Sequence, residues 1–250
     1  MTDLDTTPAP TSTAHTWRPP TGIAPRGTLV VLPGRGEHGP VYERFGRRIA
    51  GDGYVVHALD TAPSTPADAV QASVAAALGP DPATPVVLVG SDTGALQALN
   101  AAAEADPAAP LQGLIVAGVA STDGAAAADP GDWQAELEAR TACPTHRQKL
   151  TDDAGFSRGR LCEPVPDALR TAARPGLPTL VLHGAADSVT PLARARTLVA
   201  GLDRATLGVL HEGRHDVLND ASHRTTAATV VVWLERLRAD ADLTPVLTLE

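Results

Sequence analysis

Short apolar runs, rich in β-branched residues, recur along the chain without alternating with polar positions. The runs are Thr28–Leu32, Tyr54–Leu59, Pro85–Val89, Leu114–Val119, Thr179–Leu182 and Thr206–Leu210. Strands that are apolar on both faces are typical of a parallel sheet that helices cover on both sides. The pattern therefore predicts the strands of a mainly parallel sheet.

Ala-rich stretches with helical spacing lie between these runs. They are Val41–Gly51, Pro66–Leu78, Gly94–Glu104, Pro191–Ala200 and Ser222–Ala239. Regular alternation of strands and helices along a chain favours a doubly wound α/β domain. We expect the helices to lie on both faces of the sheet.

One long segment interrupts this alternation. From Ser121 to about Ala173 the sequence has no strand pattern, and Gly, Pro and charged residues are frequent. It contains two helical stretches, Trp133–Arg140 and Pro166–Ala173. An insertion of this length in an α/β domain is usually a cap or lid, or else a disordered loop. We predict a small helical cap over residues 121–173, a core formed by 17–120 and 174–240, and a flexible Thr/Pro/Ala-rich leader over 1–16.

Composition narrows the classes of partner. The 250 residues include 20 Lys and Arg against 29 Asp and Glu, a net charge of −9, which disfavours binding to nucleic acid through phosphate contacts. No apolar run reaches the length of about 18 residues that a membrane span needs. Residues 1–30 lack the order of a signal peptide, so we expect a cytoplasmic protein. The expected partner is a small-molecule substrate, and a homo-oligomer stays open.

Neither a metal nor a cofactor is expected. Cys143 and Cys162 are too few for a disulfide framework or a structural zinc site. A single disulfide remains an alternative to two ordinary thiols. Gly34-Arg35-Gly36 has only two glycines and continues with an acidic residue, which does not suit a loop that cradles phosphate.

The segment Val86–Leu99 carries the strongest chemical signal. A buried strand leads directly into Gly90-Ser-Asp-Thr-Gly94 and then into a helix. This strand–turn–helix context is the one that a nucleophile elbow needs, because glycine at both ends permits a very tight turn. The residue at the centre of the turn is Asp92. The alternative is an ordinary turn in which Asp92 caps the helix.

Two further candidates each follow a predicted strand. Asp187 lies in the loop after Thr179–Leu182, and His215 lies in a Gly-containing loop after Thr206–Leu210. Taken singly, Asp187 could cap a helix and His215 could be an ordinary core or surface histidine. Together with Asp92 they follow the order nucleophile, acid, histidine, which is the chain order of the α/β-hydrolase fold.

With these residues in place, the chain resembles the α/β-hydrolase superfamily, and within it the monoacylglycerol lipase or lysophospholipase-like branch. The supporting motif is LPGRGEHGPVYERFGRRIAGDGYVVHALD, Leu32 to Asp60. The similarity covers roughly Trp17 to Leu237, without the insertion. It implies that the backbone N–H groups of Arg35 and Thr93 form an oxyanion hole, that Asp187 orients the histidine and that His215 is the base.

The sequence departs from that branch at the points that matter for chemistry. Pro33 replaces the usual histidine, and the Gly-x-Gly-x-Ser segment usually found after Asp60 is missing. The nucleophile serine is replaced by Asp92. Ser91 is one residue too early, on the wrong side of the turn, to substitute for it.

An aspartate at the elbow is similar to another set within the superfamily, the epoxide hydrolases and haloalkane dehalogenases. There the carboxylate attacks an alkyl carbon, and the resulting ester is hydrolysed. Thr93 stands where the dehalogenases have a halide-binding Trp. In the epoxide hydrolases, tyrosines of the cap donate the proton to the opening ring. The only tyrosines of this chain, Tyr42 and Tyr54, lie outside its predicted cap. His146 or Arg147 could replace them.

Three hypotheses follow. The first is a hydrolase of a small organic electrophile, epoxide-like or an ester or lactone, with Asp92 as nucleophile. The second is an enzyme on the same fold in which Asp92 and His215 act as acid and base without a covalent step, for a lyase, cyclase, isomerase or direct water attack. The third is a non-catalytic ligand-binding protein on a hydrolase scaffold.

Overall fold

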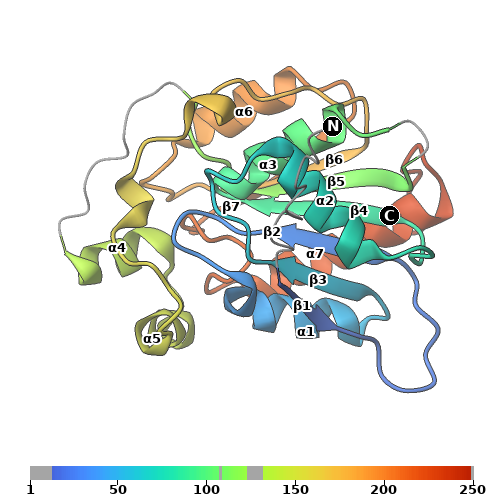
Figure 1. Cartoon of the computed structure of the whole chain (residues 1–250), viewed down its shortest axis with the longest axis horizontal. Coiled ribbons are helices and arrows are strands. Elements are labelled where there is room, and N and C mark those ends of the chain that lie inside the picture. Colours follow the sequence, from blue (N-terminus) through green and yellow to red (C-terminus); the bar gives the residue numbers. More distant parts are fainter. Residues whose placement is uncertain (1–12, 107–108, 123–131, 249–250) are drawn as a thin grey trace, which may run out of the picture.

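A computed structural model of the chain describes residues 13–106, 109–122 and 132–248. Seven strands form one sheet in the order β1-β3-β2-β4-β5-β6-β7 (Figure 1). The strands are β1 Ala14–Trp17, β2 Thr28–Leu32, β3 Val55–Leu59, β4 Val86–Ser91, β5 Leu111–Ala117, β6 Thr179–Gly184 and β7 Ala205–Leu210. All neighbours pair in parallel except β1, which runs antiparallel to β3.

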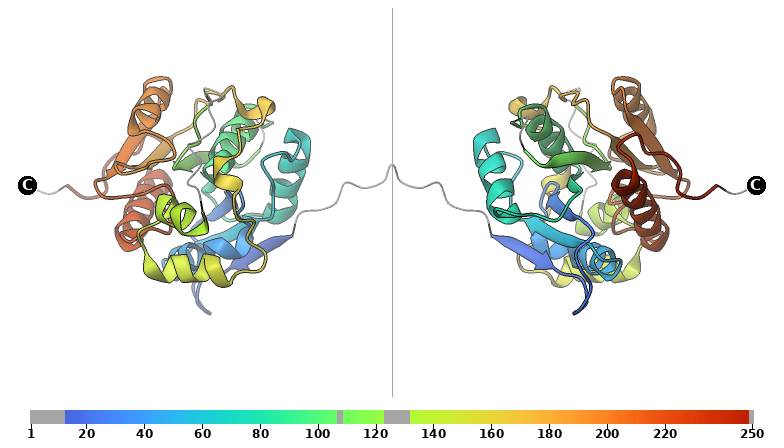
Figure 2. Two further views of the ribbon diagram at one scale, coloured as in Figure 1. Left: turned by 90° about the vertical axis from the view of Figure 1, so that its left-hand side faces the viewer. Right: turned by 90° about the vertical axis from the view of Figure 1, so that its right-hand side faces the viewer.

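Helices cover both faces of the sheet (Figure 2). The helices of the core are α1 Glu43–Gly51, α2 Ala67–Leu78, α3 Thr93–Ala103, α6 Leu192–Ala200 and α7 His223–Ala239. Successive residues of a strand point to opposite faces, so Leu29 and Val31 join the core under α1 and α7, whereas Val30 and Leu32 join the core under α2, α3 and α6. The predicted mainly parallel, two-sided α/β architecture is confirmed.

The predicted strands and core helices match the observed ones to within three residues at each end. One strand was not predicted. The edge strand β1 overlaps the last three residues of the leader predicted over 1–16, and residues 1–12 lie outside the described part of the chain. Its sequence, Ala-His-Thr-Trp, is short, partly polar and at most half-buried, so it lacks the apolar run that marked the interior strands.

The insertion is helical where the structure describes it. It contains α4 Trp133–Arg140, as predicted, and α5 Pro144–Asp152, which was not predicted because only His146 and Leu150 are buried on it. The helix predicted over Pro166–Ala173 is wrong: only a 3₁₀ turn forms, Asp167–Leu169. Beyond that turn the Ala173 N–H donates to the side chain of Asn100 instead of continuing a helix. Residues 123–131 of the predicted cap lie outside the described residues.

The described part of the insertion lies against the loops that follow β2 and β7. The Ser157 N–H donates to the Gly36 carbonyl at 2.9 Å, and the Asp216 N–H donates to the Arg140 carbonyl at 2.8 Å. These contacts place the insertion over the carboxyl ends of the strands, where the loops of an α/β sheet converge. Cys143 and Cys162 are both free thiols. None of the described helices is long and apolar enough to cross a membrane.

Candidate active site

The turn between β4 and α3 has the geometry of a nucleophile elbow. Asp92 has φ 51° and ψ −117°, a left-handed conformation that non-glycine residues rarely adopt. A Cβ on Gly90 would lie 2.2 Å from the Gly94 carbonyl oxygen, and a Cβ on Gly94 would lie 2.2 Å from the Leu32 carbonyl oxygen. Only glycine fits at both ends of the turn. The Asp92 side chain makes no capping hydrogen bond to α3, so the alternative of a helix cap is wrong.

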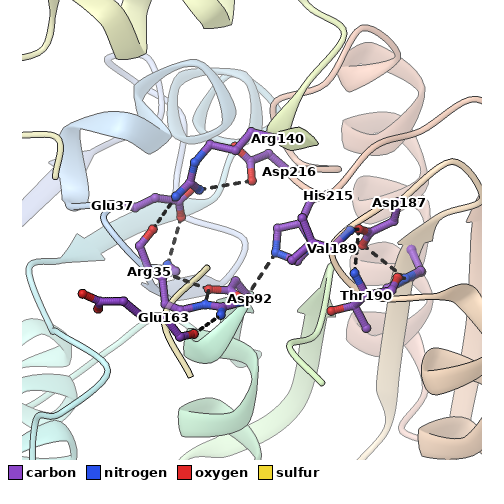
Figure 3. A network of polar contacts seen from close by, with 12 residues as sticks. Arg35, Glu37, Asp92, Arg140, Glu163, Asp187, Val189, Thr190, His215 and Asp216 are labelled. Atoms are coloured by element: carbon purple, nitrogen blue, oxygen red, sulfur yellow. Dashed lines mark hydrogen bonds and ion pairs between the residues drawn. The ribbon is translucent and has the colours of Figure 1, made fainter. Parts of the chain in front are cut away.

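His215 lies between two carboxylates (Figure 3). Its Nδ1–H donates to Asp187 Oδ2 at 2.9 Å, and its Nε2 is 3.3 Å from Asp92 Oδ1. All three residues are nearly inaccessible to solvent: 1% of Asp92, 9% of Asp187 and 1% of His215 is exposed. The fold thus brings together three residues that are separated by up to 123 positions in the sequence, on the loops after β4, β6 and β7.

Asp187 is held by the backbone of its own loop. Its Oδ1 accepts from the N–H groups of Val189 and Thr190 at 2.8 and 2.9 Å. His183, at the end of β6, donates from Nε2 to the Thr190 carbonyl at 2.8 Å, and the same nitrogen is 3.3 Å from Asp187 Oδ2. These contacts fix the carboxylate that orients His215.

Asp92 is held by one arginine from the loop after β2. The Arg35 backbone N–H and Nε donate to Asp92 Oδ2 at 2.9 and 2.8 Å, and Arg35 Nη2 donates to Oδ1 at 2.8 Å. Arg35 Nη1 donates to the carbonyl of Glu163, in the insertion, at 2.5 Å. The side chain is 4% exposed. One residue therefore links the β2 loop, the elbow and the insertion.

A second buried arginine supports the first. Arg140, at the end of α4, donates from Nη2 to the Arg35 carbonyl at 2.7 Å and to Glu136 at 3.0 Å. Its Nη1 is 3.4 Å from Glu37 Oε1 and 3.7 Å from Asp216 Oδ1. Arg140 is fully buried, and Glu136 and Glu37 supply the counter-charge that a buried guanidinium needs.

The charges of the site shift the pKa values of its groups. Burial would raise the pKa of the Asp92 carboxyl, but the Arg35 charge and the contact with His215 hold it well below its usual value. Burial opposes a proton on His215, yet Asp187 and Asp92 raise its pKa to about 10. Burial and the neighbouring Glu37 charge raise the pKa of the Asp216 carboxyl. Against the effect of burial, the His215 charge lowers the pKa of the Asp187 carboxyl. At neutral pH Asp92 and Asp187 are therefore ionised on either side of an imidazolium.

The structure brings Asp92, Asp187, His215 and the Arg35 N–H close together, and their catalytic roles stay predictions. Thr93 begins α3 beside the elbow, and its role as second N–H donor stays a prediction. The groups that sequence reasoning missed are the Arg35 side chain, Glu37, Arg140, His183 and Asp216. Only Glu37 carried a signal, as part of the motif Leu32 to Asp60.

The two residues suggested as donors from the cap do not contact Asp92. His146 is buried with its Nε2 3.8 Å from Asp216 Oδ2, and burial lowers its pKa to about 3. Arg147 donates to the carbonyl of Thr141. Within the described residues, no group of three His, Cys, Asp or Glu side chains could hold a metal ion.

A cleft of about 350 Å³ lies beside Arg35. Its lining comes from the β2 loop, the loop after β3 and the insertion, and includes Gly36, Thr61, Ser157 and Pro164. Arg35 lines this cleft, and Asp92, to which Arg35 donates, does not.

Comparison with known proteins defines the fold. No protein-family model and no curated sequence matches the chain. Solved structures do match. The monoacylglycerol lipase of Paleococcus ferrophilus aligns with a TM-score of 0.68 and 18% identity, over 89% of this chain and 98% of that one. An esterase from Exiguobacterium antarcticum aligns with a TM-score of 0.67 and 18% identity, over 90% and 96%.

A soluble variant of the Saccharomyces cerevisiae monoglyceride lipase aligns similarly, with a TM-score of 0.67 and 15% identity over 89% of this chain and 90% of that one. The chain has the α/β-hydrolase fold, as its sequence predicted. At these identities the likeness concerns the fold, so the chemistry has to be argued from the residues of this site.

Proposed function

We propose that the protein is a hydrolase of a small organic electrophile, with Asp92 as nucleophile. The observation that carries the proposal is the position of His215, which lies 2.9 Å from Asp187 and 3.3 Å from an elbow aspartate. A carboxylate needs no base to become nucleophilic. An epoxide-like substrate is favoured, because attack on an acyl carbon by Asp92 would give an anhydride.

The charge state of His215 argues against this histidine as the base of the first step. With Asp92 and Asp187 both ionised, the pKa of His215 is raised to about 10, so at neutral pH it carries a proton and cannot accept one. Once Asp92 becomes an ester, one of the two carboxylate charges is gone. The pKa of His215 then falls, and the base becomes available for the second step.

The proposed reaction has two steps. Asp92 Oδ1 forms a bond to the substrate carbon while the ring C–O bond breaks, and the His215 imidazolium gives its proton to the released oxygen. Neutral His215 then takes a proton from water, whose oxygen attacks Asp92 Cγ. The tetrahedral intermediate expels the product alcohol, which takes up the second water proton, and leaves the Asp92 carboxylate beside a protonated His215. Together the two steps add one water to the epoxide.

The Arg35 backbone N–H supports the second step. It lies 2.9 Å from Asp92 Oδ2, the oxygen that gains negative charge when water attacks Cγ, and a fixed donor at that position stabilises the intermediate. We further propose that residues 121–173 form a cap, and that substrate approaches Asp92 from the cleft beside Arg35.

Oxygen labelling tests the proposal. With enzyme in excess over propylene oxide or styrene oxide in ¹⁸O-water, the first product should be unlabelled and the elbow peptide around Asp92 should gain the label. His215→Ala removes the acid of the first step and the base of the second. With longer incubation the ester should form slowly, with a proton from solvent, and then accumulate as a mass increase of the intact chain. His211→Ala is the control, because His211 is exposed and follows the same strand.

Other outcomes point to the competing hypotheses. A labelled first product without an adduct would mean that water attacks the substrate directly, with Asp92 and His215 as acid and base. Absence of turnover and adduct with both epoxides, together with a ligand-induced rise in thermal stability, would indicate a binding protein.

A further inference from the structure

The side chain of Arg35 makes contacts that an oxyanion loop does not require. A backbone N–H alone would serve as the donor, yet the guanidinium also contacts both oxygens of Asp92, through Nε to Oδ2 and Nη2 to Oδ1, each at 2.8 Å. This is the two-pronged geometry in which arginine binds a planar carboxylate. Three donors of one residue thus converge on the proposed nucleophile.

Arg35 is also held by contacts that do not involve Asp92, one on its guanidinium and one on its backbone. Its Nη1 donates to the Glu163 carbonyl at 2.5 Å, and Arg140 holds the Arg35 carbonyl at 2.7 Å. These contacts do not depend on the charge of Asp92. The guanidinium therefore has reason to stay in place when Asp92 is esterified, and a donor already in place costs no reorganisation when charge develops.

We propose that the Arg35 guanidinium is itself a catalytic group, which stabilises the oxyanion formed at Asp92 when water attacks the covalent ester. This rests on the proposed function, because it assigns a role within the second step. In that step the water oxygen bonds to Asp92 Cγ, and the carbonyl electron pair moves onto Oδ2. Nε and the backbone N–H of Arg35 both donate to this oxygen.

The same contacts have the opposite effect on the first step. A guanidinium on both oxygens stabilises the resting carboxylate and lowers its nucleophilicity, and Nη2 has to leave Oδ1 as the substrate carbon approaches. Arg35 should therefore slow the attack by Asp92 and accelerate hydrolysis of the ester. A purely structural role would not separate the two steps in this way.

The test is a comparison of the two steps in Arg35→Lys and Arg35→Gln, with styrene oxide as probe and His215 intact. Lysine keeps the buried positive charge but cannot present two parallel donors. We expect hydrolysis of the adduct to slow by roughly 10²- to 10³-fold in both variants. In Arg35→Lys adduct formation should be unchanged or faster, because the retained charge keeps Asp92 ionised; in Arg35→Gln the loss of that charge also favours protonation of Asp92, so Arg35→Lys decides between the two steps. The ester should then accumulate, as a mass increase that quenched-flow sampling of the intact chain resolves.

Arg47→Gln is the matched control, because Arg47 is exposed on α1 and pairs with Glu43, one turn earlier on the same helix. It should show no accumulated ester. Circular dichroism shows whether each variant folds. If Arg35→Gln does not fold, Arg35→Lys alone carries the test.

Equal slowing of both steps, or unchanged hydrolysis in both Arg35 variants, would overturn the role of the guanidinium and leave the proposed function standing. If the wild type in excess over the same epoxide in ¹⁸O-water gives a labelled first product, water attacks the substrate directly and the proposed function itself fails. The two failures are therefore distinguishable.

Discussion

Two aspartates lie at opposite nitrogens of one imidazole, and their surroundings differ. Asp187, beside His215 Nδ1, is held by the N–H groups of Val189 and Thr190 and by a buried histidine. Asp92, beside His215 Nε2, is held by an arginine that also binds the insertion. Both carboxylates have a lowered pKa. Both carboxylates are negatively charged, but uncharged donors bind Asp187 whereas a charged guanidinium binds Asp92.

This difference separates a fixed partner from a reactive one. Uncharged donors from a rigid loop keep Asp187 in a single orientation and leave its charge to act on the imidazole. A guanidinium on Asp92 can respond when the charge of that carboxylate disappears and returns.

Exchanging each carboxylate for an amide gives the largest expected contrast. Asp92→Asn removes the proposed nucleophile, so turnover should fall by roughly 10⁴-fold or more and no adduct should form. Asp187→Asn leaves the nucleophile but no longer orients His215, so turnover should fall by roughly 10²- to 10⁴-fold while an adduct still forms and hydrolyses slowly. Single-turnover kinetics with intact-mass detection separates the two patterns. An adduct in Asp92→Asn would place the nucleophile elsewhere.

Much of this contrast was not predictable from the sequence. The apolar runs predicted the parallel sheet, and the glycines around Asp92 predicted the elbow, because these patterns depend on burial and on local sterics. The partners of Asp92 depend on side-chain placement across the fold. Arg140 lies 105 positions from the Arg35 carbonyl that it holds, and nothing in the local pattern of α4 indicates that contact.

The edge of the molecule was equally hard to predict. The strand β1 and the helix α5 bury too few apolar side chains to give a periodic signal. The resemblance to the hydrolase branch did indicate the Arg35 N–H, since that position belongs to a motif. It gave no indication of the guanidinium, because a side chain at that position is free to vary when only the backbone is used.

The pH dependence of stability tests whether His215 carries a charge between the two carboxylates. Its folded-state pKa of about 10 lies above the ordinary value of 6.5, so its stabilising contribution is complete below pH 6.5. That contribution is lost as pH rises from 6.5 to about 10. The free energy of unfolding of the wild type should therefore decrease across this range, as measured by urea denaturation at successive pH values.

Two variants serve as controls for this decrease. His215→Gln should remove it, because glutamine does not titrate. In Asp92→Asn the decrease should end at a lower pH, since only Asp187 then raises the pKa of His215. The tyrosines do not interfere. Burial raises the pKa of Tyr42 and Tyr54, so their titration changes the free energy of unfolding only above about pH 10. An identical slope in the wild type and His215→Gln would show that the imidazole is not charged between the two carboxylates.

The smallest expected effect concerns the group behind Asp187. Burial lowers the pKa of His183, so the ring is neutral at pH 7 and its Nε2–H holds the Thr190 carbonyl and faces Asp187 Oδ2. His183→Ala removes that support without touching Asp92 or Arg35. Partners of this kind usually contribute about ten- to a hundredfold to activity, and we expect a tenfold fall in kcat with little change in KM. The alkaline decrease in stability should also end at a lower pH, because a less ordered Asp187 raises the pKa of His215 less. His183→Gln, which keeps a side-chain N–H, should recover part of both effects. A loss of stability that is the same at every pH would assign His183 to packing alone.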